Sequence, residues 1–276
     1  MHRLPLNKHE IQSTSMLQIV HSDVWGPAPI SFLFGYNFYV VFIDNFTRFT
    51  WFFLLKQKSE LFIVFKHFKN PEENQYSSKI KILRSDNSGE YVNSQFQNFC
   101  SEHVILHQTF CRHTPQKNGI SKRKHRHIVE TSLAVLYQSH LPLNFWSYAF
   151  SIASFLINKL PSSALNFTSP WEKVNSVSQP LSALKTFDCA CYPYLIPYNK
   201  QKLQPRSVEC VFLGYPPLSK GYLCLDPTTN KIYTVCYALV NEHFSLLPIN
   251  LISPIHILLS LIPSLVLIGL FQFSSF

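Results

Sequence analysis

Three runs of apolar residues near the start of the chain constrain its fold more than any other feature. Residues 18–25, 37–44 and 49–56 are rich in aromatic and β-branched side chains, which is typical of strands. The first run ends at Gly26 and Pro27, and only residues 45–48 separate the second run from the third. We therefore expect three early strands that form an antiparallel meander.

Helical patterns alternate with strands further along the chain. A helix is expected from Ser59 to about Phe68, because Pro71 disturbs its continuation. Strands are predicted at 79–86 and 104–110, and helices at 94–103, 120–140 and 144–159. This order predicts the α/β class, with a mixed sheet and helices packed against it.

Short strands replace this pattern beyond Pro180. Residues 208–215, 221–226 and 231–240 have the composition of strands, and "PTTN" is a turn signal between the last two. These features predict a small all-β module. The boundary between the two parts is expected between Trp171 and Leu184.

Positive charge is concentrated in one segment of the chain. There are 24 Lys and Arg residues against 15 Asp and Glu, which gives a net charge of +9. No acidic residue lies between Glu102 and Glu130, but six cations do: Arg112, Lys117, Lys122, Arg123, Lys124 and Arg126. A basic segment of this kind favours a nucleic-acid partner, with a solvated surface helix as the alternative.

The cysteines and the chain ends bear on localisation. Seven scattered cysteines, and a polar basic stretch at residues 1–10, indicate an intracellular protein of the nucleus or cytoplasm that is not secreted. Residues 247–276 carry no charge, and their longest proline-free stretch is 13 residues. A spanning helix needs about 20 apolar residues. We expect a disordered tail outside the fold, and a membrane anchor is the alternative.

Two aspartates stand at the ends of predicted strands. Asp23 lies at the end of the first strand, and Asp86 ends the strand at 79–86. Ligands of open α/β sheets bind outside the carboxyl ends of strands, so these two side chains can converge on a divalent cation. Oxygen ligands favour Mg²⁺ or Mn²⁺. The alternative is that each aspartate caps a turn.

A third group of residues has the spacing of a zinc site: Cys100, His103, His107 and Cys111. The segment runs from the end of a helix into a strand, where alternate side chains face opposite ways. We therefore do not expect these four side chains to meet at one ion.

Several long segments resemble one known family. "HSDVWGP", "FIDNFTRFTW", "LRSDNSGEY", "TPQKNGISKRKHRHIVE", "LPLNFWSYA" and "NKLP" resemble the integrase core of copia-type retrotransposon polyproteins. "FDCACYPYLIPYNKQKLQPRSVECVFLGY" and "KGYLCLDPTTNKIY" resemble the small barrel that follows that core. The resemblance implies a ribonuclease-H-like core at 16–175 and a Src-homology-3-like module at 184–246. Residues 1–15 resemble the edge of the preceding segment, and 247–276 resemble nothing in the family.

The resemblance also implies an active site. The family is one of DDE-type polynucleotidyl transferases, in which three carboxylates hold two Mg²⁺ or Mn²⁺ ions that act on retroelement ends and target DNA. Two of the carboxylates match Asp23 and Asp86. The third is a Glu on a later helix, and its usual spacing of 35 residues after Asp86 leads to Lys122. The family pattern "NGxxERxxR" stands against "NGISKRKHR" in this chain.

Lys122 changes what is expected of this member of the family. An ammonium group cannot ligate a metal ion, and reversing one charge beside a divalent ion costs on the order of 10 kcal/mol as an upper bound. Glu130 lies about 12 Å further along the helix and cannot replace the missing ligand. Pro71, within an expected helix, is a second departure from the family. We expect little or no strand transfer, possible homo-oligomers as in related integrases, and DNA binding through Lys117, Arg123, Lys124 and Arg126.

Overall fold

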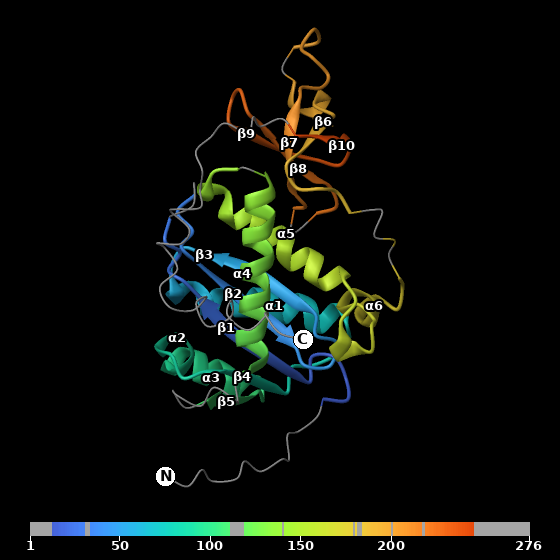
Figure 1. Cartoon of the computed structure of the whole chain (residues 1–276). Coiled ribbons are helices and arrows are strands. Elements are labelled where there is room, and N and C mark those ends of the chain that lie inside the picture. Colours follow the sequence, from blue (N-terminus) through green and yellow to red (C-terminus); the bar gives the residue numbers. More distant parts are fainter. Residues whose placement is uncertain are drawn as a thin grey trace, which may run out of the picture. The chain divides into compact units, whose positions relative to one another are not determined.

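The computed structural model describes residues 13–30, 34–110, 119–139, 141–178, 180, 184–199, 201–216 and 219–245 (Figure 1). They group into two compact units. The first contains the described residues of Met1–Ser132 and Asn144–Lys185, and the second those of Leu133–Leu143 and Thr186–Phe276. The tail at 247–276, most of segment 1–15, and Lys117 lie outside the described residues.

The first unit is built on a mixed five-stranded sheet. Its strands are β1 (Ile19–Trp25), β2 (Phe38–Asp44), β3 (Thr50–Leu55), β4 (Ile82–Asp86) and β5 (Leu106–Phe110), in the order β3-β2-β1-β4-β5. Strands β1, β2 and β3 pair antiparallel, whereas β4 runs parallel to both β1 and β5. The predicted meander and the mixed sheet are confirmed.

Helices lie on both sides of this sheet, with α4 in front of it and α1 behind it in Figure 1. The helices are α1 (Leu61–Gln75), α2 (Gly89–Val92), α3 (Ser94–Glu102), α4 (Gly119–Ser139), α5 (Trp146–Lys159) and α6 (Pro170–Asn175). Short 3₁₀ turns occur at Lys58–Glu60, Leu143–Phe145 and Ser163–Leu165. The last turns of α4 are grouped with the second unit.

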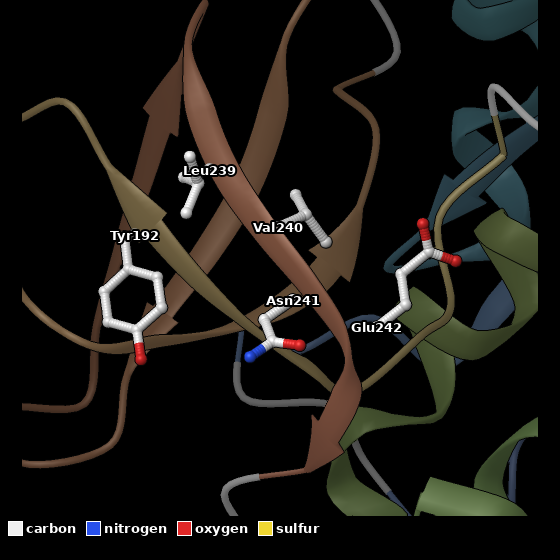
Figure 2. Close-up of a pocket in the computed structure, with 5 residues that line it drawn as sticks. All are labelled: Tyr192, Leu239, Val240, Asn241 and Glu242. Carbon is white, nitrogen blue, oxygen red and sulfur yellow. The ribbon is translucent and has the colours of Figure 1, made fainter.

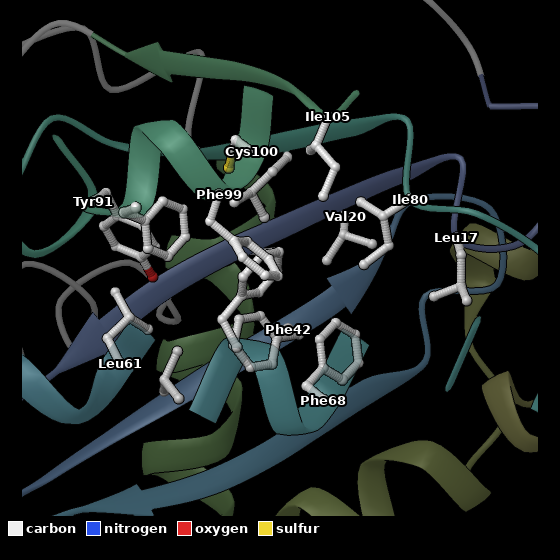
Figure 3. Close-up of a cluster of buried hydrophobic side chains, with 14 of the residues drawn as sticks. Leu17, Val20, Phe42, Leu61, Phe68, Ile80, Tyr91, Phe99, Cys100 and Ile105 are labelled. Carbon is white, nitrogen blue, oxygen red and sulfur yellow. The ribbon is translucent and has the colours of Figure 1, made fainter. Parts of the chain in front are cut away.

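Aromatic side chains fill the space between the sheet and helices α1 and α3 (Figure 3). Phe42 of β2 stacks on Phe68 of α1, with ring centroids 4.3 Å apart. Phe65 of α1 contacts Phe96 of α3 at 5.2 Å. All four rings are almost completely buried. Each contributes about 1.5–3 kcal/mol by leaving water, so this layer is the main core of the first unit.

Helix α1 contradicts one expectation. It continues through Pro71 for another turn to residue 75, instead of ending near Phe68. A proline inside a helix loses one backbone hydrogen bond, which costs about 3 kcal/mol. Contacts beyond the proline offset that loss, because the buried Glu73 accepts hydrogen bonds from Lys69 Nζ and the Ile80 backbone N–H, each at 2.9 Å. The prediction was wrong because it considered only local backbone preference.

The opposite face of the sheet carries a second aromatic group. Trp25 of β1 stacks on Tyr39 of β2 at 5.1 Å. Trp146 and Phe150 of α5 contact Trp25 at centroid distances of 6.3 and 5.6 Å. Residues two apart in a strand face the same side, so Asp23 lies on this face with Trp25.

The second unit holds an all-antiparallel sheet. Its strands are β6 (Cys189–Pro193), β7 (Cys210–Gly214), β8 (Tyr222–Asp226), β9 (Lys231–Val235) and β10 (Ala238–Ser245), in the order β10-β6-β7-β8-β9. The predicted all-β module is confirmed. The single strand predicted at 231–240 is wrong. Because β9 pairs with β8 and β10 with β6, the chain crosses between opposite edges of the sheet at Cys236 and Tyr237.

Candidate active site at the ends of strands β1 and β4

The two predicted carboxylates stand on neighbouring parallel strands. Strands β1 and β4 pair with Ile19 opposite Ile82 and His21 opposite Arg84. Continuing this register by two residues brings Asp23 level with Asp86 on the same face of the sheet. Adjacent strands lie about 4.8 Å apart, so the two carboxylates are neighbours at the strand ends. The fold thus brings together two residues that are 63 positions apart in the sequence.

Asp86 caps the turn that leads into helix α2. Its Oδ1 accepts a hydrogen bond from the hydroxyl of Ser88 at 2.7 Å and one from the Ser88 backbone N–H at 3.3 Å. This is a local turn in which an aspartate side chain bonds the backbone two residues on. The turn-capping alternative therefore holds for one oxygen of Asp86, and the turn fixes the direction of the carboxylate.

Asp23 faces a buried histidine of helix α4. The Nε2 atom of His125 lies 3.7 Å from Asp23 Oδ2, and its Nδ1 lies 2.9 Å from the hydroxyl oxygen of Tyr39. Burial lowers the pKa of His125 to about 4, against a smaller opposing effect of the Asp23 backbone. The imidazole is therefore neutral at pH 7. Burial, and secondly the Asp23 carboxylate, raise the pKa of Tyr39, which keeps its proton.

Several carboxylates act on one buried phenol, that of Tyr91. The hydroxyl of Tyr91, at the start of α2, lies 2.6 Å from Ser22 Oγ. Burial raises the pKa of Tyr91 well above its usual range, and the carboxylates of Asp23, Asp86 and Glu90 raise it further. The three carboxylates thus act on one hydroxyl group. Glu90 is also engaged elsewhere, because its Oε1 lies 3.5 Å from the ammonium group of Lys58.

Helix α4 presents different residues to the sheet and to solvent. Ser121, His125, Ile128 and Ser132 are buried, at the spacing of one helix face. The exposed side chains on the other face are Lys122, Arg123, Arg126, His127 and Glu130. Lys122, at the position of the expected Glu, is therefore on the solvent side, one turn before His125. The predicted DNA contacts Arg123 and Arg126 lie on the same exposed face.

Lys124 differs from the other predicted DNA contacts. It is half-buried, and burial together with the charge of Arg48 lowers its pKa to about 8. A lysine in this position is less available to phosphate than its exposed neighbours. Lys117, the fourth predicted contact, lies outside the described residues.

A pocket in the second unit holds none of the predicted site residues. It has a volume of about 490 Å³ and is lined by Tyr192, Leu239, Val240, Asn241 and Glu242 of strands β6 and β10 (Figure 2). Tyr192 and Leu239 are directly opposite each other in the sheet. With one carboxylate and no nucleophile among its lining residues, this pocket does not suggest a catalytic centre.

Comparisons with known proteins identify two domain families in the chain. Residues 13–115 match the family described as "Integrase core domain", and residues 189–249 match "Retroviral polymerase SH3-like domain". The chain thus contains an integrase core domain followed by a retroviral SH3-like domain. These two matches include Asp23, Asp86 and the whole sheet of the second unit, whereas Lys122 lies beyond the end of the first match.

The similar curated proteins are retrotransposon polyproteins. The integrase chain is 44% identical over 233 residues to the "Retrovirus-related Pol polyprotein from transposon RE2" of Arabidopsis thaliana, and 45% identical over 231 residues to that from transposon RE1. Each match covers 84% of this chain and 16% of the relative, so the chain spans about a sixth of the relatives' length.

A solved structure shares the fold of the integrase chain. It is a chain of the simian T-cell lymphotropic virus intasome in complex with PP2A regulatory subunit B56 gamma. The TM-score is 0.51 at 18% identity, and the match covers 90% of this chain and 85% of that chain. At this identity the likeness concerns the fold alone.

The residues of the integrase core fit one divalent ion better than two. Two neighbouring carboxylates plus waters can hold one Mg²⁺ or Mn²⁺. Within the described residues, no three His, Cys, Asp or Glu side chains are placed to hold a metal ion together. A two-metal centre of the kind that three carboxylates form does not fit this arrangement, because the position where the resemblance expects the third carboxylate holds an exposed lysine.

The zinc-like spacing does not produce a cluster among the residues that the structure describes. Cys100 is a buried residue of α3, and the Nδ1 atom of His103 lies 2.9 Å from the Phe99 carbonyl oxygen. His107 Nε2 lies 2.9 Å from the hydroxyl of Ser85. Cys111 lies outside the described residues.

Sequence reasoning missed His125 and Tyr39 as members of this site. His125 stands between four cations in the sequence, where it looks like part of a basic surface run. One signal was present: His125 is four residues after Ser121 and three before Ile128, which is the spacing of a buried helix face. Its partner Tyr39 lies 86 residues away, so the pair depends on long-range packing.

Proposed function

We propose that this chain is the integrase segment of a copia-type element, that it still binds DNA, and that it has lost strand-transfer activity. The observation that carries this proposal is Lys122, which stands on the solvent face of α4 where the resemblance expects a metal-ligating Glu. Asp23 and Asp86 remain neighbours at the strand ends. The proposed state is a carboxylate pair that binds Mg²⁺ or Mn²⁺ weakly and lacks the ligand for a second ion.

The exposure of Lys122 decides whether charge repulsion or the loss of a ligand matters more for metal binding. A buried ammonium beside the carboxylates would repel a divalent ion by an amount on the order of 10 kcal/mol. An exposed lysine can turn toward solvent, so most of that repulsion is relieved. What remains is the missing ligand. Substitution of the lysine by a neutral residue is therefore expected to restore little, and substitution by glutamate is expected to restore more.

DNA binding is proposed to involve the exposed cations of α4, chiefly Arg123 and Arg126. Their charges are solvated and available to phosphate, and each phosphate contact releases counterions. The proposed partners are retroelement ends and target DNA, with a second copy of the chain as a possible further partner. We also propose that the protein acts inside the cell, in the nucleus or cytoplasm.

The activity test compares three proteins: the natural chain, Lys122→Glu and Lys122→Gln. Strand transfer is measured on a labelled element-end duplex with Mg²⁺ or Mn²⁺. We expect no joining by the natural chain or by Lys122→Gln, and metal-dependent joining by Lys122→Glu. Robust joining by the natural chain would contradict the proposed inactivity. Joining by Lys122→Gln equal to that of Lys122→Glu would show that charge, and not the ligand, was limiting.

An alternative function is favoured by the charge-free segment 247–276. In this alternative the chain is a basic membrane-associated protein anchored by that tail. Within the described residues, no helix is long and apolar enough to cross a membrane. Flotation with vesicles, before and after deletion of residues 247–276, separates the two functions: tail-dependent flotation in the absence of DNA supports the alternative.

A further inference from the structure

The buried face of α4 contains polar atoms that the proposed function does not explain. His125 is 8% exposed, and its Nε2 has no hydrogen-bond partner within the described residues. The same holds for the hydroxyl of Ser121, one turn earlier on the same face. Buried polar groups are normally paired, so an unpaired one calls for an explanation. Nε2 of His125 lies 3.7 Å from Oδ2 of Asp23, and the backbone of Asp23 also interacts with the imidazole.

The hydrogen-bond chemistry of the ring assigns its tautomer. Nδ1 of His125 lies 2.9 Å from the hydroxyl oxygen of Tyr39, and either atom can be the donor. If Nδ1 carried the hydrogen of a neutral ring, the lone pair of Nε2 would face a carboxylate, and two acceptors would oppose each other. If Tyr39 donates to Nδ1, the hydrogen lies on Nε2 and faces Asp23. The second arrangement is electrostatically favourable at both ends of the ring.

The ring of Tyr39 is itself held firmly. It packs against Trp25 at 5.1 Å, Phe52 at 4.9 Å and Phe150 at 5.5 Å between centroids. The position of its hydroxyl oxygen is therefore fixed, and an imidazole that accepts a hydrogen bond from this hydroxyl has a defined orientation. The 3.7 Å separation between Nε2 and Asp23 Oδ2 is longer than a hydrogen bond, which needs about 2.7–3.2 Å, so the contact between them is electrostatic.

We propose that His125 is a positioning residue for Asp23, oriented in turn by Tyr39. The chain of contacts runs from the Tyr39 hydroxyl to Nδ1, and from Nε2–H to the Asp23 carboxylate. Its effect is to aim that carboxylate toward the ion shared with Asp86, as groups behind metal ligands commonly do. This role rests on the proposed function in one respect, namely that Asp23 is a metal ligand. Helix α4 then supplied two groups to the site, and the change to Lys122 removed only one.

The first test reads the tautomer directly in the full natural chain. In the nitrogen NMR spectrum of ¹⁵N-histidine-labelled protein, we expect His125 to show a protonated Nε2 and an unprotonated Nδ1. The signals are assigned by their loss in His125→Gln. Tyr39→Phe is expected to shift Nδ1, and Asp23→Asn to shift Nε2. A hydrogen on Nδ1, or an Nε2 signal that is unchanged in Asp23→Asn, would overturn the proposal.

The second test measures metal affinity in the Lys122→Glu background, by the electron paramagnetic resonance signal of free Mn²⁺. Adding His125→Leu, which has no donor, is expected to weaken Mn²⁺ binding by about 10–100-fold. Adding His125→Gln, whose amide N–H can reach Asp23, is expected to retain affinity within a few-fold. The control is His127→Leu on the exposed face of the same helix, which should leave affinity unchanged.

The two tests fail in different ways. If Lys122→Glu binds no Mn²⁺, the proposed metal site is wrong, and the tautomer still decides whether His125 is directed at Asp23. If His125→Leu and His125→Gln weaken binding equally, the histidine is a packing residue and the proposal is overturned. Circular dichroism of each variant separates loss of binding from loss of the fold, and His125→Gln keeps the test valid if His125→Leu does not fold.

Discussion

Helices α1 and α4 pack on opposite faces of one sheet, and they do so with different chemistry. The buried residues of α1 are the apolar Leu61, Phe65 and Phe68 and, near its end, the ion pair of Lys69 with Glu73. The buried face of α4 in the first unit includes Ser121, His125 and Ser132. Buried polar groups lose their hydrogen bonds to water and need a partner inside the protein. The two charges of α1 pair with each other, whereas Nε2 of His125 and the hydroxyl of Ser121 on α4 have no hydrogen-bond partner within the described residues.

The two helices also carry the two most unusual residues of the chain, and the outcomes differ. Pro71 weakens the backbone of α1, yet packing and the Glu73 contacts keep the helix intact. Lys122 leaves the backbone of α4 unaffected, because lysine is a good helix former. In the proposed function, what Lys122 removes is a metal ligand. A fold thus tolerates a local defect that many contacts can offset, whereas a proposed site with two carboxylates has no second source for a third.

The largest expected effect comes from the core face of α1. Phe65→Ala removes a fully buried ring, and we expect the free energy of unfolding of the first unit to fall by about 3–5 kcal/mol. The measurement is urea unfolding followed by tryptophan fluorescence. Ile63→Ala on the same helix is the control, because Ile63 is 57% exposed and should change stability by less than about 0.5 kcal/mol. Similar losses in both variants would mean that α1 does not pack as described.

The second effect concerns the contacts that hold α1 beyond its proline. Glu73→Gln leaves the buried ammonium of Lys69 without its counter-charge, and we expect a loss of about 3 kcal/mol at pH 7. The control is Glu102→Gln, at an exposed position of α3. If the stability is unchanged in Glu73→Gln, contacts other than those of Glu73 offset the free-energy cost of Pro71.

The same glutamate predicts a dependence on pH. Burial opposes ionisation, but the Ile80 N–H and Lys69 outweigh it and lower the pKa of Glu73 below its ordinary value of 4.5. A depressed folded-state pKa gives stability that is complete above the unfolded-state value and is lost as pH falls through the folded-state value. Unfolding of the natural chain should therefore become easier below about pH 4.5. Glu73→Gln should remove part of that dependence, and an unchanged pH profile would contradict this assignment.

The contrast between the two helices also shows what the sequence could predict. The strands that carry Asp23 and Asp86 were predictable, because alternating apolar residues and turn residues are local signals, although β1 continues past Asp23 to Trp25. The continuation of α1 through Pro71 was not, because it depends on Glu73 meeting Ile80 in three dimensions. Likewise, the split of the predicted strand at 231–240 follows from which neighbour each half pairs with. Local rules fail where a partner far along the chain decides the outcome.

The site itself was predictable to the same extent. Motifs and spacing single out Asp23, Asp86 and Lys122 as candidates, and the parallel pairing of β1 with β4 places the strands of the two aspartates side by side. His125 was hidden among cations, because charge composition does not say which side of a helix faces the sheet. The helical spacing of buried and exposed residues does indicate which side of α4 faces the sheet. The contact with Tyr39, however, joins two elements whose packing no local pattern specifies.

The smallest expected effect tests the solvent face of α4 against that of α1. Arg126→Ala removes one exposed cation from α4, and Lys66→Ala removes one exposed cation from α1. If DNA lies along α4, Arg126→Ala should make the plot of log affinity against log salt less steep by about 0.9, the value of one phosphate contact. Lys66→Ala should leave the slope unchanged.

Fluorescence anisotropy with a labelled duplex between 50 and 200 mM salt, roughly the range over which such contacts are resolved, measures both slopes. Equal changes in the two variants would show that DNA is held by the net charge of the chain and not by one helix, because a diffuse interaction does not distinguish the two faces.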